Sequence, residues 1–432
     1  MKATPISNPA GTPDTSKKTI GVVGLGYVGL PLAVAFAKKG HRVIGFDVDP
    51  ERIEQLRHCK DRTGEVETAD LKAVEKCFLA TRRVTSLCEA QIHIVAVPTP
   101  VDARNVPDLT LLKNACELLG KHLSRGSIVV FESTVYPGCT EEVCIPELER
   151  VSGMEEGVDF HVAYSPERVN PGDREHTLKT VTKIIGASDT RVHSELAGLY
   201  NQISPVYPVE ISIRVAEAAK AIENAQRDIN IAFVNELAMM FAKMGIDTRE
   251  VLRAARTKWN FLDFRPGLVG GHCIGVDPYY IAHRAQEFGY HPEVILAGRR
   301  TNEAVAQHIA LRLYKRMRKQ VVFDEFYRVL VLGVTFKEDC PDTRNSKVFD
   351  VVRELREMGC VVCVCDPLAG LDYSQEDNLR CEDVFGLEWD GIVLAVPHKE
   401  FQSIDFIKLK REKAVVFDVK GVLPDAIAEL RL

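Results

Sequence analysis

The sequence predicts an α/β protein in which two Rossmann-like, doubly wound parallel-sheet domains are joined by a central helical domain with one long helix. Three observations predict this fold. Apolar strand-like runs alternate with helical stretches near both ends of the chain, the two series resemble each other segment by segment, and one long helical pattern separates them. Such alternation is typical of a parallel sheet with helices on both faces, and 432 residues are enough for two or three separate cores.

The first series occupies residues 18–205, which we assign to one domain. Its runs are, in order, TIGVVGLG, LPLAVAFAKKG, HRVIGFDVD, IHIVAVPTP and GSIVVFEST. Residues 1–17 are rich in Pro, Ser, Thr and Gly and contain no apolar run, so we expect a disordered tail rather than a targeting signal.

The central helical domain is expected at residues 206–318, and it contains a helix from about Ser212 to Met244. Apolar residues recur along one face of that helix, at Ile222, Ala225, Ile229, Phe233, Leu237 and Met240. An apolar stripe needs a partner surface, and we expect a homodimer formed through this helix. Packing within the chain would satisfy the stripe equally.

The second series occupies residues 319–432 and runs through FYRVLVLGV, MGCVVCVCDP, DGIVLAVPHKE and KAVVFDVKG. It has no glycine fingerprint, so we expect this domain to bind a ligand other than a dinucleotide. Cys360 and Cys363 form a CxxC pattern within a strand-like run, where core packing is a better interpretation than a zinc site. We therefore expect no metal.

The composition is that of a globular cytoplasmic protein, with 46% hydrophobic and 27% charged residues. A net charge of −6 argues against nucleic acid or an anionic membrane surface as the partner and favours a small molecule. The twelve cysteines are scattered, without the spacing of a disulfide scaffold, so we expect reduced thiols. The apolar stretch Thr19–Ala37 carries glycines spaced for a turn, which disfavours a membrane span.

The motif Gly24-Leu-Gly26-Tyr27-Val28-Gly29 follows a strand-like run and opens a helical one. In a dinucleotide-binding turn the first glycine permits the tight turn, the second lets the backbone approach a pyrophosphate, and the third lets helix and strand pack closely. Asp47 ends the next strand, where its carboxylate binds ribose hydroxyls and repels a 2′-phosphate. We therefore expect NAD as the cofactor; the alternative is a glycine-rich turn without a ligand.

A second motif, GGHCIGVDPYY, extends from Gly270 to Tyr280 and places Cys273 between His272 and Asp277. Flanking glycines let the backbone of a nucleophile enter a crowded site. A thiolate that attacks an aldehyde forms a thiohemiacetal, which becomes a hydrolysable thioester once it loses hydride. The alternative is a buried cysteine that only packs.

Lys220 and Asn224 are four residues apart on the long helix and share one face outside the apolar stripe. A fixed cation and an amide donor suit the stabilisation of an alkoxide or a tetrahedral oxyanion. The alternative is a solvated helix face.

Together these motifs resemble the UDP-glucose/GDP-mannose dehydrogenase family, and the resemblance extends from Ile20 to Leu432. Four further landmarks occur in the family's order: VPTP from Val97, ESTVYPG from Glu132, YSPER from Tyr164 and GVTFKED from Gly333. The motif GGHCIGVDPYY has Val276 where UDP-glucose dehydrogenases typically have lysine. In this it resembles the family members that act on UDP-N-acetylhexosamines in bacterial surface-polysaccharide pathways.

The resemblance implies catalytic roles. Cys273 would be the nucleophile, and Lys220 and Asn224 would hold the reacting oxygens. Asp277 would position a water or support Lys220, and Glu167 would be the general base, with Pro171 standing where the family often has a second glutamate.

The resemblance also implies binding roles. Thr134 would hold a catalytic water or lie near the nicotinamide and Thr99 would line the cofactor, although helix capping is an alternative for both. The cofactor set is completed by Tyr27 and Val28 in the glycine turn, Arg52 over the adenine or in a surface ion pair, and Arg344 on the pyrophosphate. The C-terminal domain would hold the UDP moiety, and the substrate contacts would be Glu167, Arg168, Lys220, Asn224, Arg265, Gly267, His272, Phe336 and Lys337.

The expected reaction is the oxidation of the C6 alcohol of a UDP-N-acetylhexosamine, with UDP-GlcNAc favoured, to a uronate by two successive hydride transfers to NAD. Within this class, UDP-GalNAc, UDP-ManNAc and UDP-glucose remain open as substrates. Outside it, the sequence leaves open a β-hydroxyacid dehydrogenase that performs a single oxidation and a catalytically silent NAD-binding protein.

Overall fold

The computed structural model describes residues 17–102, 104–169, 175–271, 274–320 and 325–432. The chain divides into two compact units, one up to Ala221 and one from Ile222 onward, and helix α7 (Ile213–Met244) crosses the boundary between them. Within the described ranges, the protein contains no helix with the length and apolar character that crossing a bilayer requires.

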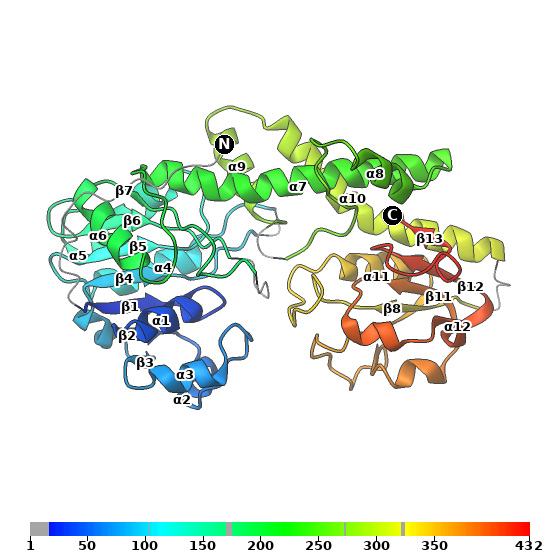
Figure 1. The fold of residues 1–432 in the computed structure, drawn as a ribbon, viewed down its shortest axis with the longest axis horizontal. Coiled ribbons are helices and arrows are strands. Elements are labelled where there is room, and N and C mark those ends of the chain that lie inside the picture. The colour runs from blue at the N-terminus through cyan, green and yellow to red at the C-terminus, as the bar shows by residue number, and fades with distance from the viewer. Residues whose placement is uncertain (1–16, 103, 170–174, 272–273, 321–324) are drawn as a thin grey trace. The chain divides into compact units, whose positions relative to one another are not determined.

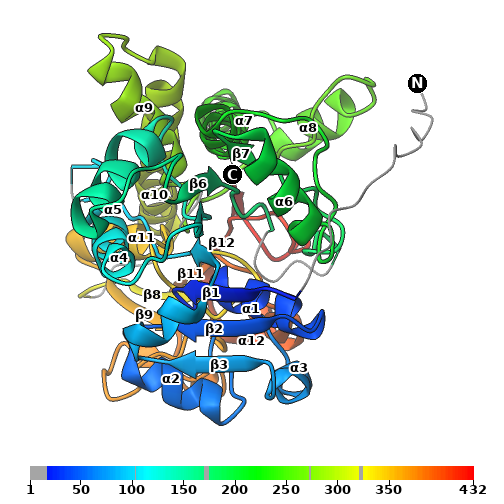
Figure 2. The same cartoon turned by 90° about the vertical axis from the view of Figure 1, so that its left-hand side faces the viewer.

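The first unit contains a sheet whose strands follow the order β3-β2-β1-β4-β5-β6-β7. Figures 1 and 2 show β1, β2 and β3 side by side. The order reverses between β1 and β4, which is the point where open α/β sheets bind ligands. The strands are β1 (Thr19–Val23), β2 (Arg42–Phe46), β3 (Phe78–Thr81), β4 (Ile92–Val95), β5 (Ile128–Phe131), β6 (His161–Tyr164) and β7 (Gly186–Ala187).

The pairing of β6 with β7 is antiparallel, whereas the other pairs in this sheet are parallel as predicted. A parallel neighbour needs a crossover connection, usually a helix, and the described residues between β6 and β7 contain none. The two residues of β7 are too few to show a sequence pattern, so the sequence did not predict this strand.

The helices of the first unit bury apolar faces against its sheet. Phe36 of α1 and Tyr200 of α6 meet edge to face, with ring centroids 5.5 Å apart, in a core shared with Ile20 and Val22 of β1. The helices are α1 (Gly29–Lys38), α2 (Pro50–Arg57), α3 (Thr68–Val74), α4 (Thr110–Gly120), a π-helical turn η2 (Thr140–Cys144), α5 (Ile145–Ser152) and α6 (Thr190–Tyr200).

The second unit contains a parallel sheet in the order β10-β9-β8-β11-β12-β13, which repeats the arrangement of the first sheet. The two Rossmann-like sheets that the sequence predicts are therefore confirmed. The strands are β8 (Arg328–Leu332), β9 (Val361–Cys365), β10 (Asn378–Leu379), β11 (Trp389–Leu394), β12 (Lys410–Asp418) and β13 (Leu430–Arg431).

Helices α10 and α11 cover the core of the second unit, where Leu313, Met317 and Leu355 pack on Val329 and Val331 of β8. Cys360 and Cys363 are also buried in this unit, and the eleven cysteines in the described ranges are free thiols. The α-helices of this unit after α7 are α8 (Thr248–Ala255), α9 (Asp277–Glu287), α10 (Glu293–Gln320), α11 (Val348–Glu357) and α12 (Phe406–Leu409).

Helix α7 confirms the predicted long helix (Figure 1). Ala225 in the predicted apolar stripe is buried, but Ile222, Phe233 and Met240 are largely exposed. The stripe is therefore only partly covered within this chain.

Candidate active site

The glycine turn after β1 meets three different steric demands. Gly24 has φ +91°, and a Cβ there would lie 2.7 Å from the carbonyl oxygen of Ala96, whereas a Cβ on Gly29 would lie 1.8 Å from the carbonyl oxygen of Gly24. A Cβ on Gly26 would meet no atom within 4 Å. Packing within the protein thus requires glycine at Gly24 and Gly29, while the bare backbone at Gly26 leaves room for a ligand.

The start of α1 is suited to an anion. Val28 precedes the helix, no described side chain caps it, and its first turn has no acidic residue, so the positive end of its dipole is not neutralised there by a carboxylate and favours a pyrophosphate. Tyr27 and Val28 are half-buried beside this turn. Together with the open space at Gly26, these features fit the pyrophosphate of a dinucleotide.

Asp47 lies at the end of β2 beside the same turn. Its Oδ2 accepts the N–H of Leu25 at 2.8 Å and its Oδ1 accepts the N–H of Asp49 at 3.0 Å. The carboxylate is half-buried, so lone pairs remain for the ribose hydroxyls that the sequence assigns to it.

Arg52 has a different environment from either of those predicted. Its side chain is buried, its Nε donates to the carbonyl oxygen of Leu25 at 2.8 Å, and it forms an ion pair with buried Asp61 at 2.8 Å. The surface ion pair is therefore wrong, because both partners are buried. Arg52 braces the glycine turn, and its contact with adenine stays a prediction.

Thr99 and Thr134 lie together beyond β4 and β5. The Thr99 hydroxyl donates to the carbonyl oxygen of Thr134 at 2.6 Å, and the hydroxyl of Ser133 donates to the carbonyl oxygen of Val97 at 2.7 Å. Neither threonine precedes a helix, since α4 begins at Thr110 and η2 at Thr140, so the capping alternative is wrong for both.

Glu167 follows β6 and has a fixed carboxylate. Its Oε1 accepts the N–H groups of Arg168 at 2.6 Å and Val169 at 2.7 Å, and its Oε2 lies 3.5 Å from Nζ of Lys183. Arg168 donates to the carbonyl oxygen of Thr182 at 2.6 Å. Sequence reasoning missed Lys183, because no motif includes it.

Lys220 is buried on α7, which makes the solvated-face alternative wrong for this residue. One turn earlier, the carboxylate of Glu217 accepts the N–H groups of Gly138 at 2.5 Å and Thr140 at 2.9 Å. Burial raises the pKa of Glu217 to about 7. Glu217, which no sequence motif singles out, thus joins the helix of Lys220 to the segment that follows Thr134.

In the second unit, Asn224 contacts Asp277, a pairing that the sequence analysis did not predict, since it assigned Asp277 to a water or to Lys220. The Nδ2 of Asn224 donates to Oδ2 of Asp277 at 2.5 Å, and Asp277 is the buried first residue of α9. This hydrogen bond fixes the side chain of Asn224 on α7 against that of Asp277, which begins the helix after the cysteine loop.

His272 and Cys273 lie outside the described residues, but the preceding segment is closely held. Gly267 accepts a hydrogen bond from Asn235 of α7 at 3.0 Å and donates one to it at 2.8 Å. A Cβ on Gly270 would lie 2.6 Å from the carbonyl oxygen of Asn345, and one on Gly271, with φ +84°, would lie 3.0 Å from the ring of Phe336. The glycines thus permit the approach to the loop after β8.

That loop repeats the geometry of the glycine turn. Gly333 has φ +83° with a Cβ position 2.3 Å from the carbonyl oxygen of Val396, and Asp366 at the end of β9 accepts the N–H groups of Val334 and Thr335 at 2.6 and 3.1 Å. Asp366 also accepts from Leu368 and Ala369 and contacts the buried His398, so its carboxylate is saturated. It cannot serve ribose as Asp47 can, which supports a different ligand.

The predicted binding side chains of the second unit occupy distinct places. Lys337 lies 5.6 Å over the ring of Phe336, and Arg344 forms an ion pair with Asp342 at 2.6 Å while remaining half-exposed. Arg265 is exposed. The ligand contacts assigned to these residues stay predictions.

Comparison with known proteins agrees with this geometry. Models of the UDP-glucose/GDP-mannose dehydrogenase family match residues 18–204 as the NAD binding domain, 214–304 as the central domain and 330–425 as the UDP binding domain. The chain is 49% identical to Protein CapL of Staphylococcus aureus over 419 residues, covering 94% of this chain and 96% of that protein. It is 48% identical to UDP-N-acetyl-D-glucosamine 6-dehydrogenase of Pseudomonas aeruginosa over 423 residues, covering 96% and 99%.

A solved structure of UDP-D-ManNAc dehydrogenase from Pyrococcus horikoshii has a TM-score of 0.84 at 30% identity, covering 95% of this chain and 97% of that one. The glycine turn, the anion-ready start of α1 and Asp47 fit the NAD that the first matched domain binds. The chain therefore belongs to the UDP-glucose/GDP-mannose dehydrogenase family and is an NAD-dependent dehydrogenase of UDP-sugars.

Proposed function

We propose that this enzyme oxidises the C6 alcohol of UDP-N-acetylglucosamine to the carboxylate of the corresponding uronate. The observation that carries the substrate assignment is the near-50% identity, over almost the full length, to a relative named for this activity, against 32% for a relative named as a UDP-N-acetyl-D-mannosamine dehydrogenase. Val276 beside Asp277 and the GGHC motif support a UDP-N-acetylhexosamine, rather than UDP-glucose, as the substrate.

The glycine turn at Gly26 and the carboxylate of Asp47 would hold NAD⁺, which would supply the hydride acceptor for both oxidations. In the first oxidation, Lys220 and Asn224 hold the C6 oxygen while its proton passes to water and the alcohol becomes an aldehyde. The Asn224 amide has two N–H groups, of which one is held by Asp277. We assign the second to the reacting oxygen, because a donor fixed before the reaction stabilises developing charge without reorganisation.

In the second oxidation, the thiolate of Cys273 adds to the aldehyde carbon, and the resulting thiohemiacetal would become a thioester once its hydride is removed and its hydroxyl proton passes to water. Glu167 then takes a proton from the water that attacks the thioester, which releases uronate and the thiol. The overall reaction consumes one water and two NAD⁺ and releases uronate, two NADH and three protons. We propose that the uronate serves surface-polysaccharide assembly.

The test is an NADH-release assay with UDP-GlcNAc, UDP-GalNAc, UDP-ManNAc and UDP-glucose, in which NADH is counted against uronate. We expect the highest kcat/KM with UDP-GlcNAc and two NADH per uronate. A higher kcat/KM with another sugar would replace the substrate assignment. One NADH per product would favour a β-hydroxyacid dehydrogenase, and no NADH with any of the four would favour a silent NAD-binding protein.

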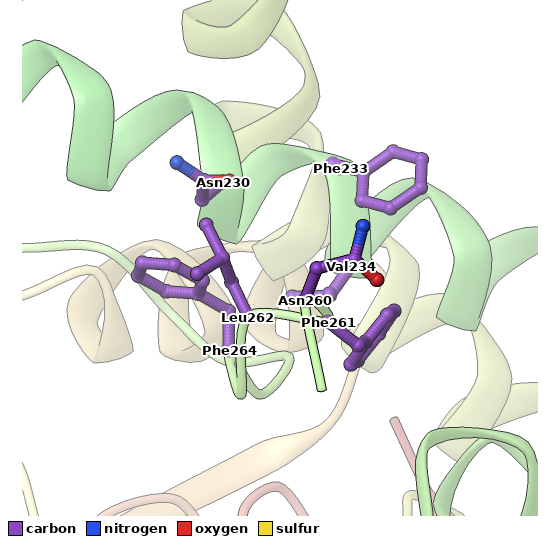
Figure 3. Close-up of a pocket in the computed structure, with 7 residues that line it drawn as sticks. All are labelled: Asn230, Phe233, Val234, Asn260, Phe261, Leu262 and Phe264. Atoms are coloured by element: carbon purple, nitrogen blue, oxygen red, sulfur yellow. The ribbon is translucent and has the colours of Figure 1, made fainter. Parts of the chain in front are cut away.

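We further propose a homodimer formed through α7. Figure 3 shows a pocket between α7, which provides Asn230, Phe233 and Val234, and the segment after α8, which provides Asn260, Phe261, Leu262 and Phe264. Phe233 is 54% exposed and Leu262 58%, and nearby in sequence Trp259 is 92% exposed. A second copy that buried these side chains would remove them from water.

Light scattering tests the dimer. The parent should have twice the mass of one chain and Phe233→Glu the mass of a single chain, and a monomeric parent would refute the dimer.

A further inference from the structure

A buried cluster of charged side chains lies behind Glu167 in the first unit. Its centre is Lys183, whose side chain is 1% exposed, and its other members are Glu132, whose side chain is 0% exposed, and Tyr200. Nothing in the glycine turn or the cysteine loop accounts for this cluster. A lysine is almost never buried to this extent without paired charges.

The ammonium of Lys183 is surrounded by oxygen acceptors from two segments. It forms an ion pair with Glu132, donates to the carbonyl oxygen of Pro166 at 3.1 Å, and lies 3.5 Å from both the carbonyl oxygen of Ser165 and Oε2 of Glu167. Glu132 directly follows β5, and Ser165 directly follows β6. Lys183 therefore ties together the carboxyl ends of two adjacent parallel strands, which carry Thr134 and Glu167.

Glu132 is itself held in place. The hydroxyl of Tyr200 donates to Oε1 of Glu132 at 2.7 Å, and the Tyr200 ring lies 5.5 Å from Nζ of Lys183. Burial raises the pKa of Glu132 to about 7, although the charge of Lys183 acts in the opposite direction. The ammonium cannot rotate towards solvent, because its partners surround it and the side chain is buried.

The position of Lys183 matters for Glu167 because of how that carboxylate is oriented. Its Oε1 is fixed by two backbone N–H groups, and its Oε2 faces the ammonium of Lys183. Glu132 shares the ammonium, so the lysine orients Oε2 from 3.5 Å without closing into a tight pair with it. A general base needs this combination of a fixed direction and an oxygen still able to accept a proton.

We propose that Lys183 is a positioning residue for Glu167, and that Glu132 and Tyr200 hold Lys183 in place for that purpose. This inference rests on the proposed function, in which Glu167 activates the water that hydrolyses the thioester. Lys183 touches neither substrate nor cofactor in this assignment. It acts on the hydrolytic step and not on the two oxidations.

The experiment compares the parent enzyme with Lys183→Met/Glu132→Gln, in which both charges are removed so that neither is left buried alone. Lys183→Arg, which keeps a cation, is the rescue variant. Lys18→Met is the matched control, because Lys18 forms an ion pair with Glu195 in the same unit away from the glycine turn. The readouts are kcat, the KM values for UDP-GlcNAc and NAD⁺, the first-turnover burst of NADH, and the fraction of acid-quenched enzyme that carries a substrate acyl group by intact-mass spectrometry.

We expect kcat of the double variant to fall about 10- to 100-fold, since a misplaced base loses much of its rate contribution. Neither the KM for UDP-GlcNAc nor the KM for NAD⁺ should rise, and the NADH burst should persist, because binding and oxidation precede the affected step. Acyl-enzyme should accumulate, Lys183→Arg should recover part of kcat, and Lys18→Met should match the parent.

A double variant whose kcat stays within about twofold of the parent would overturn the inference. Loss of the NADH burst with no acyl-enzyme would also overturn it, because the defect would then lie in oxidation or folding. A parent enzyme that releases no NADH with any of the four sugar nucleotides would overturn the proposed function, and this inference with it. The two failures are therefore distinguishable.

Discussion

Replacing Gly26 with alanine should weaken NAD⁺ binding without lowering the stability of the protein. A Cβ at this position meets no protein atom within 4 Å, and the backbone is not in the left-handed region, so alanine fits the free enzyme. The change in the free energy of unfolding should be within about 1 kcal/mol and can be favourable, because alanine restricts the unfolded chain. The added methyl group instead occupies the space into which the pyrophosphate must come.

We expect the Kd for NAD⁺ to rise about 10- to 100-fold, which corresponds to about 1.4 to 2.7 kcal/mol. Gly29→Ala is the matched control. Its Cβ would lie 1.8 Å from the carbonyl oxygen of Gly24, so helix and strand must separate, and the free energy of unfolding should fall by about 1 to 3 kcal/mol or more.

Urea unfolding measures the stability of both variants, and isothermal titration calorimetry measures the Kd for NAD⁺. Gly26→Ala with an unchanged Kd would refute the placement of the pyrophosphate at this turn. Gly26→Ala that unfolded as readily as Gly29→Ala would refute the claim that the site is open in the free protein.

Three further outcomes are expected. Asn235→Ala should lower the free energy of unfolding by about 1 to 3 kcal/mol in urea, because the N–H and carbonyl groups of buried Gly267 lose their partner. The folded-state pKa of Glu217, about 7, lies above its ordinary value of 4.5, so its stabilising contribution is complete below about pH 4.5 and is lost as the pH rises to about 7. In the Glu217→Gln variant, the free energy of unfolding should therefore fall less between these pH values than in the parent, by at most about 3 kcal/mol. Urea unfolding at several pH values measures this, and identical pH slopes for parent and variant would contradict it. Cys273→Ser should keep the Kd for UDP-GlcNAc but release no uronate, and uronate release at the parent rate would refute the covalent mechanism.

The fold and the cofactor site were predictable because their signals are local in sequence. One strand-turn-helix-strand unit contains Gly24, Gly26, Gly29 and Asp47, so their spacing along the chain was enough to predict how they lie relative to one another. The family pattern singled out Asn224 and Asp277 separately, but not their mutual hydrogen bond, because 53 positions separate the two residues.

Other features carried no sequence signal. From the sequence alone, Lys183 is indistinguishable from an ordinary exposed lysine, because its partner Glu132 is 51 residues away. The burial of Arg52 depends on Asp61 and on the carbonyl oxygen of Leu25, neither of which a helix pattern identifies. Such contacts arise from the packing of separate segments, which periodicity along the chain does not encode.

The two similar turns, after β1 and after β8, differ in one carboxylate. Asp47 is half-buried and accepts two backbone N–H groups, whereas Asp366 is 1% exposed, accepts four and contacts His398. A compound that presents ribose hydroxyls to a protein carboxylate will therefore bind at the first turn, beside Asp47, in preference to the second turn, beside Asp366. An inhibitor aimed at the second turn must instead gain its affinity from groups such as Phe336 and Lys337, and it need not compete with NAD⁺ or resemble it.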